Sequence, residues 1–236
     1  MSRYLLLFIV FLLNSNSSYS QETIEKIIQR HARALGGKAA WKKLKTYKMV
    51  IHRNAENGSF ISVATMKRPD KYRLDFKGDG ENLVKSFDGS DGWYNENGKI
   101  SDMRPGEAIE MAEEGRYYEE LALSQELNYK TKLLGKEELD GKIVYKILMQ
   151  KPNNDRQYYY VDTNTYLIYM TSEFSEDKAY KGVEFKTKMW DYREVDGLLF
   201  PFAMELYAND QLLRSYKVDT IEVNPEILDI LFKRPE

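Results

Sequence analysis

The run of residues 86–98, SFDGSDGWYNENG, concentrates the residue types that bind metal ions or phosphate groups. A calcium loop of the EF-hand type places a bidentate glutamate twelve positions after its first acidic ligand, and counting from Asp88 that position holds Lys99. A phosphate cradle needs a following helix and a lysine beside its glycines, and the run has neither. The sequence therefore favours turns between strands over a ligand loop.

Catalytic and metal-binding chemistry has few other candidates in the chain. There are only two histidines, His31 and His52, and no cysteine, so neither a thiolate site nor a histidine cluster is expected. No serine stands in a Gly-x-Ser-x-Gly turn, and among 37 acidic residues a close carboxylate pair would arise by chance. The sequence predicts a protein that is not an enzyme, with no catalytic residue, metal or cofactor.

The start of the chain has the form of a secretory signal. Arg3 is followed by an apolar run, residues 4–13, and then by small polar residues up to Ser20. The apolar run is too short to span a bilayer. Residues 1–20 are therefore expected to be a cleaved signal peptide, and residues 21–236 a single domain in the periplasm. The mature chain would carry a net charge of about −3, because the whole chain carries −2 and loses Arg3. This balance disfavours nucleic acid as a partner.

The spacing of apolar residues predicts a mainly β domain with few helices. Residues 22–35 have helical periodicity and end at a pair of glycines, residues 38–44 form a short helix, and 105–128 is a helical insertion. From residue 45 onward the period is two, with turn residues between the apolar runs. About ten antiparallel strands would form a sheet too large to stay flat, so we expect an unclosed β-barrel or half-barrel with helices against its concave side.

One face of these strands is rich in aromatic residues and methionine. This pattern fits a packed core as well as it fits an apolar cavity, and the periodicity does not separate the two. If there is a cavity, its walls are predicted to include Leu74, Phe76, Phe87, Trp93, Ile147, Met170, Phe185, Met189, Phe202 and Met204.

Four segments resemble the periplasmic outer-membrane lipoprotein-sorting proteins, the LolA/LolB-like lipoprotein carrier superfamily, in its divergent longer branch. The segment 66–76, MKRPDKYRLDF, is similar to a basic-Pro-x-x-aromatic-Arg strand of that family, and 87–94, FDGSDGWY, to its Asp-Gly and tryptophan-tyrosine hairpin. Gly36-Gly37 with Trp41, and the closing run from Val223 to Phe232, resemble the same branch.

The resemblance implies a periplasmic carrier that encloses the acyl chains of lipoproteins or other lipids in an unclosed barrel under a helical lid. It implies that Arg68 contacts the lid. As partners it implies lipoprotein acyl chains or phospholipid, an inner-membrane lipoprotein-releasing transporter and an outer-membrane acceptor, with a monomeric carrier. A sensor or protein-interaction domain of the cell envelope on the same fold is the alternative.

Overall fold

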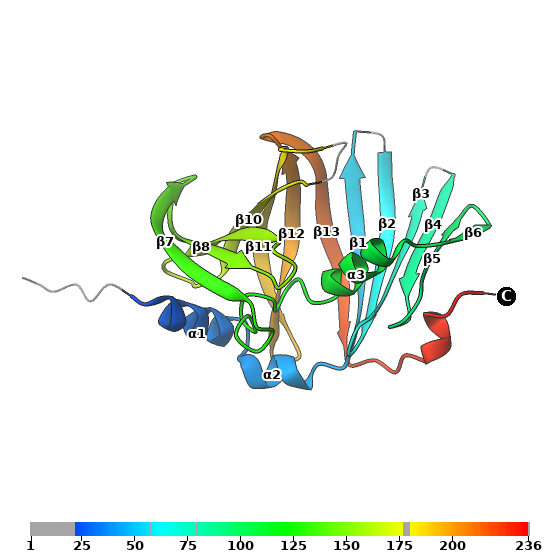
Figure 1. Cartoon of the computed structure of the whole chain (residues 1–236), viewed down its shortest axis with the longest axis horizontal. Coiled ribbons are helices and arrows are strands. Elements are labelled where there is room, and N and C mark those ends of the chain that lie inside the picture. Colours follow the sequence, from blue (N-terminus) through cyan, green and yellow to red (C-terminus); the bar gives the residue numbers. More distant parts are fainter. Residues whose placement is uncertain (1–21, 57, 79, 177–179, 236) are drawn as a thin grey trace, which may run out of the picture.

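A single antiparallel sheet organises the whole molecule. The computed structural model describes residues 22–56, 58–78, 80–176 and 180–235; the expected signal peptide lies outside these residues. Within them, thirteen strands form one sheet in the order β6-β5-β4-β3-β2-β1-β13-β12-β11-β10-β9-β8-β7. Consecutive strands pair with each other, except that β6 and β7 form the two edges of the sheet and β13 returns to pair with β1 (Figure 1).

The strands have the following bounds. The first half of the sheet holds β1 (Thr46–Ala55), β2 (Gly58–Lys67), β3 (Lys71–Gly78), β4 (Glu81–Phe87), β5 (Gly92–Glu96) and β6 (Lys99–Asp102). The second half holds β7 (Lys130–Leu139), β8 (Lys142–Gln150), β9 (Arg156–Asp162), β10 (Ile168–Phe174), β11 (Glu184–Val195), β12 (Leu198–Ala208) and β13 (Gln211–Val223). The expected unclosed half-barrel is confirmed, with thirteen strands in place of about ten.

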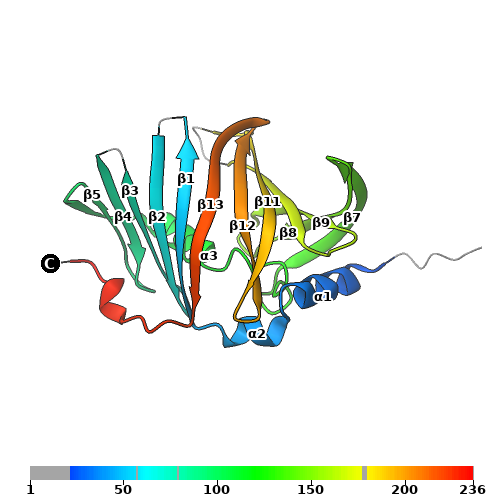
Figure 2. The same ribbon diagram turned by 180° about the vertical axis from the view of Figure 1, so that it is seen from behind.

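Irregular pairings help this long sheet to curve. The register shifts between Val50 and Ile51 of β1, between Leu133 and Gly135 of β7, and between Leu206 and Tyr207 of β12. Each shift of this kind bends a strand and increases its twist, so the sheet wraps around the elements on one side instead of extending flat. Figures 1 and 2 show α3 in front of the central strands and behind them, respectively. We call the face that α3 covers the inner face and the opposite one the outer face.

Two N-terminal helices pack below the sheet. The helix α1 (Ile24–Ala34) begins at Thr23, whose hydroxyl accepts a hydrogen bond from the Lys26 amide, and it buries Ile27 and Ile28. Two residues after its end, Gly36 has a φ of +103° and a Cβ there would lie 2.0 Å from the Gly197 carbonyl oxygen, so glycine is required. The helix α2 (Lys38–Lys43) then inserts Trp41.

The inserted segment is only partly helical, which corrects the expectation of a helix over most of residues 105–128. The helix α3 (Pro105–Glu114) ends at Gly115, and residues 115–128 continue as consecutive turns across the inner face. These turns still bury Leu121, Ala122 and Leu123 almost completely. We call residues 115–128 the covering segment.

The C-terminal residues lie on the outer face. A short 3-10 turn, Asp229–Leu231, precedes Phe232, whose side chain is fully buried. The Phe232 carbonyl oxygen accepts hydrogen bonds from the Ser86 hydroxyl and the Trp93 indole nitrogen, each at 2.9 Å. Ser86 and Trp93 face each other across β4 and β5, so this segment covers the back of the first half of the sheet. No helix in the described part of the chain is long and apolar enough to cross a bilayer.

Candidate functional site

Two tyrosines of the covering segment fill the centre of the inner face. The Tyr117 hydroxyl lies 3.0 Å from the Thr171 hydroxyl of β10. The Tyr118 hydroxyl lies 3.7 Å from the Met49 sulfur and 3.9 Å from the Met204 sulfur, so it spans the two halves of the sheet. Its ring also packs edge-on against Phe200, with ring centroids 5.8 Å apart. The interior is therefore occupied by the chain's own side chains.

Small apolar voids remain on both sides of these tyrosines. One, of about 170 Å³, is lined by residues of β1 to β3 with Glu114, Tyr117 and Tyr118. The other, of about 10 Å³, lies between Tyr117, Tyr118 and the second half of the sheet. Ligand pockets commonly measure about 300–1,000 Å³, so neither void holds an acyl chain as the structure stands.

An ion pair attaches the covering segment to the end of β2. Both oxygens of Glu119 accept hydrogen bonds from the Arg68 guanidinium, which also donates from Nε to the Leu44 carbonyl at 2.6 Å. The side chain of Glu119 is only 3% exposed. Burial raises the pKa of this carboxyl group, and the Arg68 charge offsets part of that rise.

A second ion pair attaches the covering segment to the other half of the sheet. The Lys151 ammonium lies 2.7 Å from Glu120 and 2.7 Å from Glu113, and Tyr159 donates a hydrogen bond to Glu120 at 2.8 Å. Burial alone would lower the pKa of Lys151, but the two carboxylates hold it above its ordinary range. The buried charges at both attachments are thus compensated by charges of the opposite sign.

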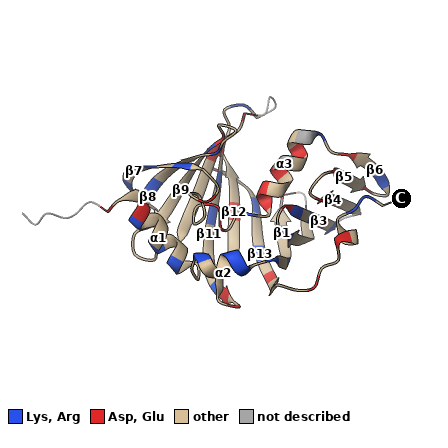
Figure 3. Ribbon diagram, turned by 60° about the horizontal axis from the view of Figure 1, so that its bottom comes forward, with Lys and Arg blue, Asp and Glu red and all other residues tan. Residues whose placement is uncertain are grey.

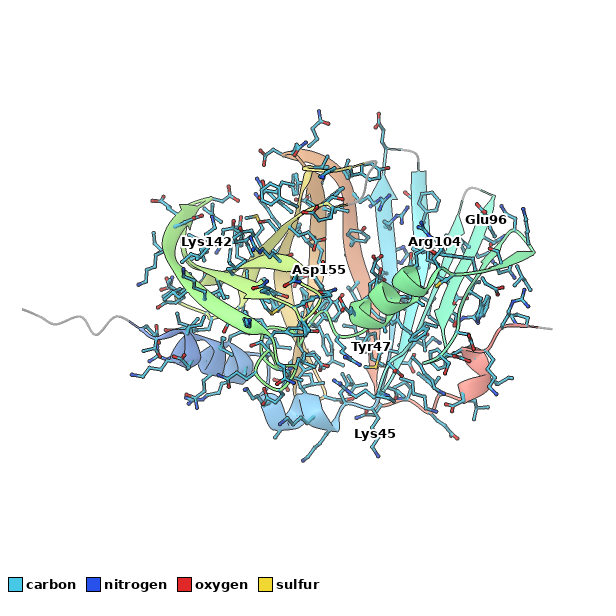
Figure 4. All side chains as sticks on the ribbon, in the orientation of Figure 1. Lys45, Tyr47, Glu96, Arg104, Lys142 and Asp155 are labelled. Atoms are coloured by element: carbon cyan, nitrogen blue, oxygen red, sulfur yellow. The ribbon has the colours of Figure 1, made fainter. Side chains whose placement is uncertain are left out.

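Beside this second attachment the inner face opens into a cleft of about 860 Å³. Residues of α3, the covering segment, the loop between β8 and β9, and strands β9 to β11 line it, and Figure 4 labels Asp155 of that loop to the left of α3. Acidic side chains outnumber basic ones in its lining by seven to two. Figure 3 shows acidic residues along α3. We call this space the acidic cleft.

The structure distributes the predicted wall residues over several environments. Met189 lines the smaller void and Phe185 lines the acidic cleft. Leu74 packs against the main core. Five other predicted residues are buried in that core: Phe87, Ile147, Met189, Phe202 and Met204. The Arg53 guanidinium lies over the Phe76 ring, 5.2 Å from the centroid of that ring.

Two predicted wall residues lie on the outer face and do not line a void. Trp93 packs there under the C-terminal segment, with its indole nitrogen bonded to the Phe232 carbonyl. Met170 belongs to a separate small cluster with Val144 and Tyr160, while the next residue, Thr171, points to the inner face. Alternation along a strand sends successive side chains to opposite faces, and the sequence does not say which face is inward. Arg68 contacts the covering segment through Glu119, and its function as a lid contact stays a prediction.

The sequence pattern does not identify the four residues that occupy the centre of this site. Tyr117, Tyr118, Glu119 and Glu120 form an aromatic pair followed by an acidic pair within an otherwise acidic segment. Adjacent tyrosines at the centre of a polar stretch are the available signal. Apart from the edge-on packing of the two rings on each other, their contacts described above are with strands distant in sequence. In the described residues, no group of three histidine or acidic side chains is placed to hold a metal ion.

No family model and no curated protein matches this sequence. Solved structures do match its shape. The outer membrane lipoprotein-sorting protein domain from Vibrio parahaemolyticus superposes with a TM-score of 0.60 at 12% identity, covering 89% of this chain and 97% of that one. A LolA superfamily protein from Nitrosomonas europaea gives 0.58 at 10% identity, covering 91% and 99%. A DUF1329 family protein from Desulfovibrio piger gives 0.58 at 12% identity, covering 90% and 98%.

The fold and the site define a class of protein: a half-barrel whose inner face is covered by an inserted segment and whose interior is apolar beside an open cleft. The fold itself is LolA-like, because structures of that type match it over nearly their whole lengths. At these identities the likeness concerns the fold alone.

Proposed function

We propose that this protein is a periplasmic carrier that binds acyl chains of lipoproteins or other lipids on its inner face, as one domain spanning residues 21–236. Leaving one acyl chain of about sixteen carbons in water costs on the order of 12 kcal/mol, so transfer through an aqueous compartment needs an apolar enclosure. The observation that carries the proposal is the arrangement at the inner face, where voids on both sides of Tyr117 and Tyr118 adjoin an open cleft.

Binding in this scheme requires the covering segment to move. The two voids are too small for a tail, but Tyr117 lines both of them and the acidic cleft as well, so its displacement would join the three spaces. The segment is attached by charge pairs at Arg68 and Lys151, and such contacts can be exchanged for water when the segment swings outward. A ligand that binds only the open arrangement would shift the population toward it.

A direct binding measurement tests the proposal. The mature chain, residues 21–236, is mixed with a lipidated peptide or with phospholipid and examined by native mass spectrometry. We expect a complex with one ligand per chain, and we expect it to increase when Tyr117 is replaced by alanine. Absence of any complex with both the natural sequence and the alanine variant would overturn the proposed function.

Exposed apolar side chains in the C-terminal segment favour a second candidate, a non-enzymatic sensor or protein-interaction domain. Leu228 and Ile230 are 65% and 69% exposed, on a segment held to the outer face by Asp229 through Lys67 and Lys71. Exposed apolar groups that lie close together are typical of interaction surfaces. If the double substitution L228S/I230S leaves acyl binding intact but abolishes function in cells, the interaction surface is required in addition.

A further inference from the structure

The acidic cleft contains carboxylates that the fold itself leaves without a partner. Glu110, Glu114 and Glu173 line it, and no cation lies within salt-bridge distance of any of them among the described residues. Glu114 and Glu173 are solvent-accessible, yet the walls of the cleft exclude part of the bulk water. This desolvation raises the pKa of both carboxyl groups; the charges of Lys85 for Glu114 and Lys151 for Glu173 offset part of the rise, and acidic neighbours add to it. A positive charge placed among them would be stabilised.

The same cleft already holds one ammonium group. Lys151 places its Nζ between Glu113 and Glu120 at 2.7 Å from each, with the Tyr129 ring 6.0 Å away. Carboxylates flanking a cation beside an aromatic face form a recurrent recognition arrangement for ammonium groups. The other carboxylates Glu110, Glu114 and Glu173 line the same cleft together with the aromatic side chains Tyr117 and Phe185, and none of the three forms an ion pair with a lysine of the described residues.

The cleft and the apolar interior meet at two side chains. Tyr117 lines the acidic cleft and both voids, and Glu114 lines the cleft and the larger void. A ligand whose tail displaced Tyr117 would therefore have its polar head among Glu110, Glu114 and Glu173. The charge of the cleft then selects the charge of the head.

We propose that the cargo is an amphiphile whose polar head carries a net positive charge, bound with its tail in the apolar interior and its head in the acidic cleft. This inference rests on the proposed carrier function and specifies its ligand class. Heads with uncompensated phosphate or carboxylate groups are disfavoured, because they would enter a cleft in which acidic side chains predominate.

Three detergents with the same twelve-carbon tail test the head-group preference. Dodecyltrimethylammonium, dodecanoate and dodecyl maltoside, each below its critical micelle concentration, compete with the fluorescent probe N-phenyl-1-naphthylamine for the mature protein. We expect the cationic compound to bind on the order of tenfold more tightly than dodecanoate, which corresponds to one favourable charge interaction at cleft distances. The neutral maltoside should lie between them.

A pair of matched variants identifies the source of that preference. E110Q/E173Q removes two cleft carboxylates, and E138Q/E222Q removes two exposed ones elsewhere, with the same change of net charge. The cleft variant should reduce the preference several-fold without changing maltoside affinity, and the control should keep it. Equal binding of cationic and anionic compounds, or a preference that survives in the cleft variant, would overturn the inference while leaving the carrier function intact. Failure of all three to bind would overturn the carrier function itself.

Discussion

The buried histidine of α1 predicts a loss of stability in mild acid. His31 is fully buried, and its Nδ1 lies 2.7 Å from the Tyr166 carbonyl oxygen, while Nε2 has no partner. Burial lowers its pKa from 6.5 to about 4, and the hydrogen bond to Tyr166 offsets only part of that effect. Between these two pH values the unfolded chain binds a proton at this residue that the folded chain does not.

The direction and size of this change in the free energy of unfolding follow from proton linkage. Because the unfolded state binds more protons here, the contribution of His31 to the free energy of unfolding is present near neutral pH and is lost as the pH falls below 6.5. For a shift from 6.5 to about 4, moving from pH 7 to pH 5 costs about 2 kcal/mol. That is a substantial fraction of the stability of a typical domain.

The assay is urea unfolding at several pH values between 7 and 4.5, with the free energy of unfolding plotted against pH. The carboxyl groups of Glu114, Glu119 and Glu173, whose pKa is raised by desolvation, also contribute to the pH dependence, so the difference between the natural chain and H31Q isolates the histidine. His52, the other histidine, is about half exposed and supplies the control H52Q. The reasoning would be refuted if H31Q kept the same pH slope as the natural chain, or if H52Q flattened it equally.

Four further predictions concern the attachments, the voids and the two faces of the sheet. Replacing Arg68 by glutamine leaves the Glu119 carboxylate buried without a cation, so chemical denaturation should show a loss of about 3–5 kcal/mol; adding E119Q should restore part of it, and no restoration would contradict the pairing. Y117A should lower stability by a few kcal/mol and raise acyl-chain affinity, since it joins the voids; unchanged affinity by fluorescent-probe titration would contradict this. W93F removes a buried donor on the outer face and should cost about 1–3 kcal/mol without altering acyl binding; weaker binding would place Trp93 at the site. G36A, with its clash at Gly197 and positive φ, should lower the melting temperature, whereas G98A, also at positive φ but with open space around it, should lower it less.

Much of the fold could be read from local patterns. The helix α1 follows from Thr23 at its start, its isoleucines on one side and the glycine pair at its end, all of which act within a few residues. The strands follow from alternation and from turn residues such as Asp140-Gly141, where both residues adopt positive φ. The curved sheet follows in turn, because that many antiparallel strands do not remain flat.

The sequence by itself determined that this is a mainly β protein with one inserted segment, since periodicity and turn chemistry are local. The tertiary structure alone decided what fills the inner face. A period of two does not distinguish the inner face from the outer face, so the sequence alone does not place Trp93 and Met170 on the outer face, where the structure has them. The positions of Tyr117 and Tyr118, and the gathering of carboxylates in one cleft, depend on contacts between segments far apart along the chain, and such contacts exist only once the sheet has curved around them.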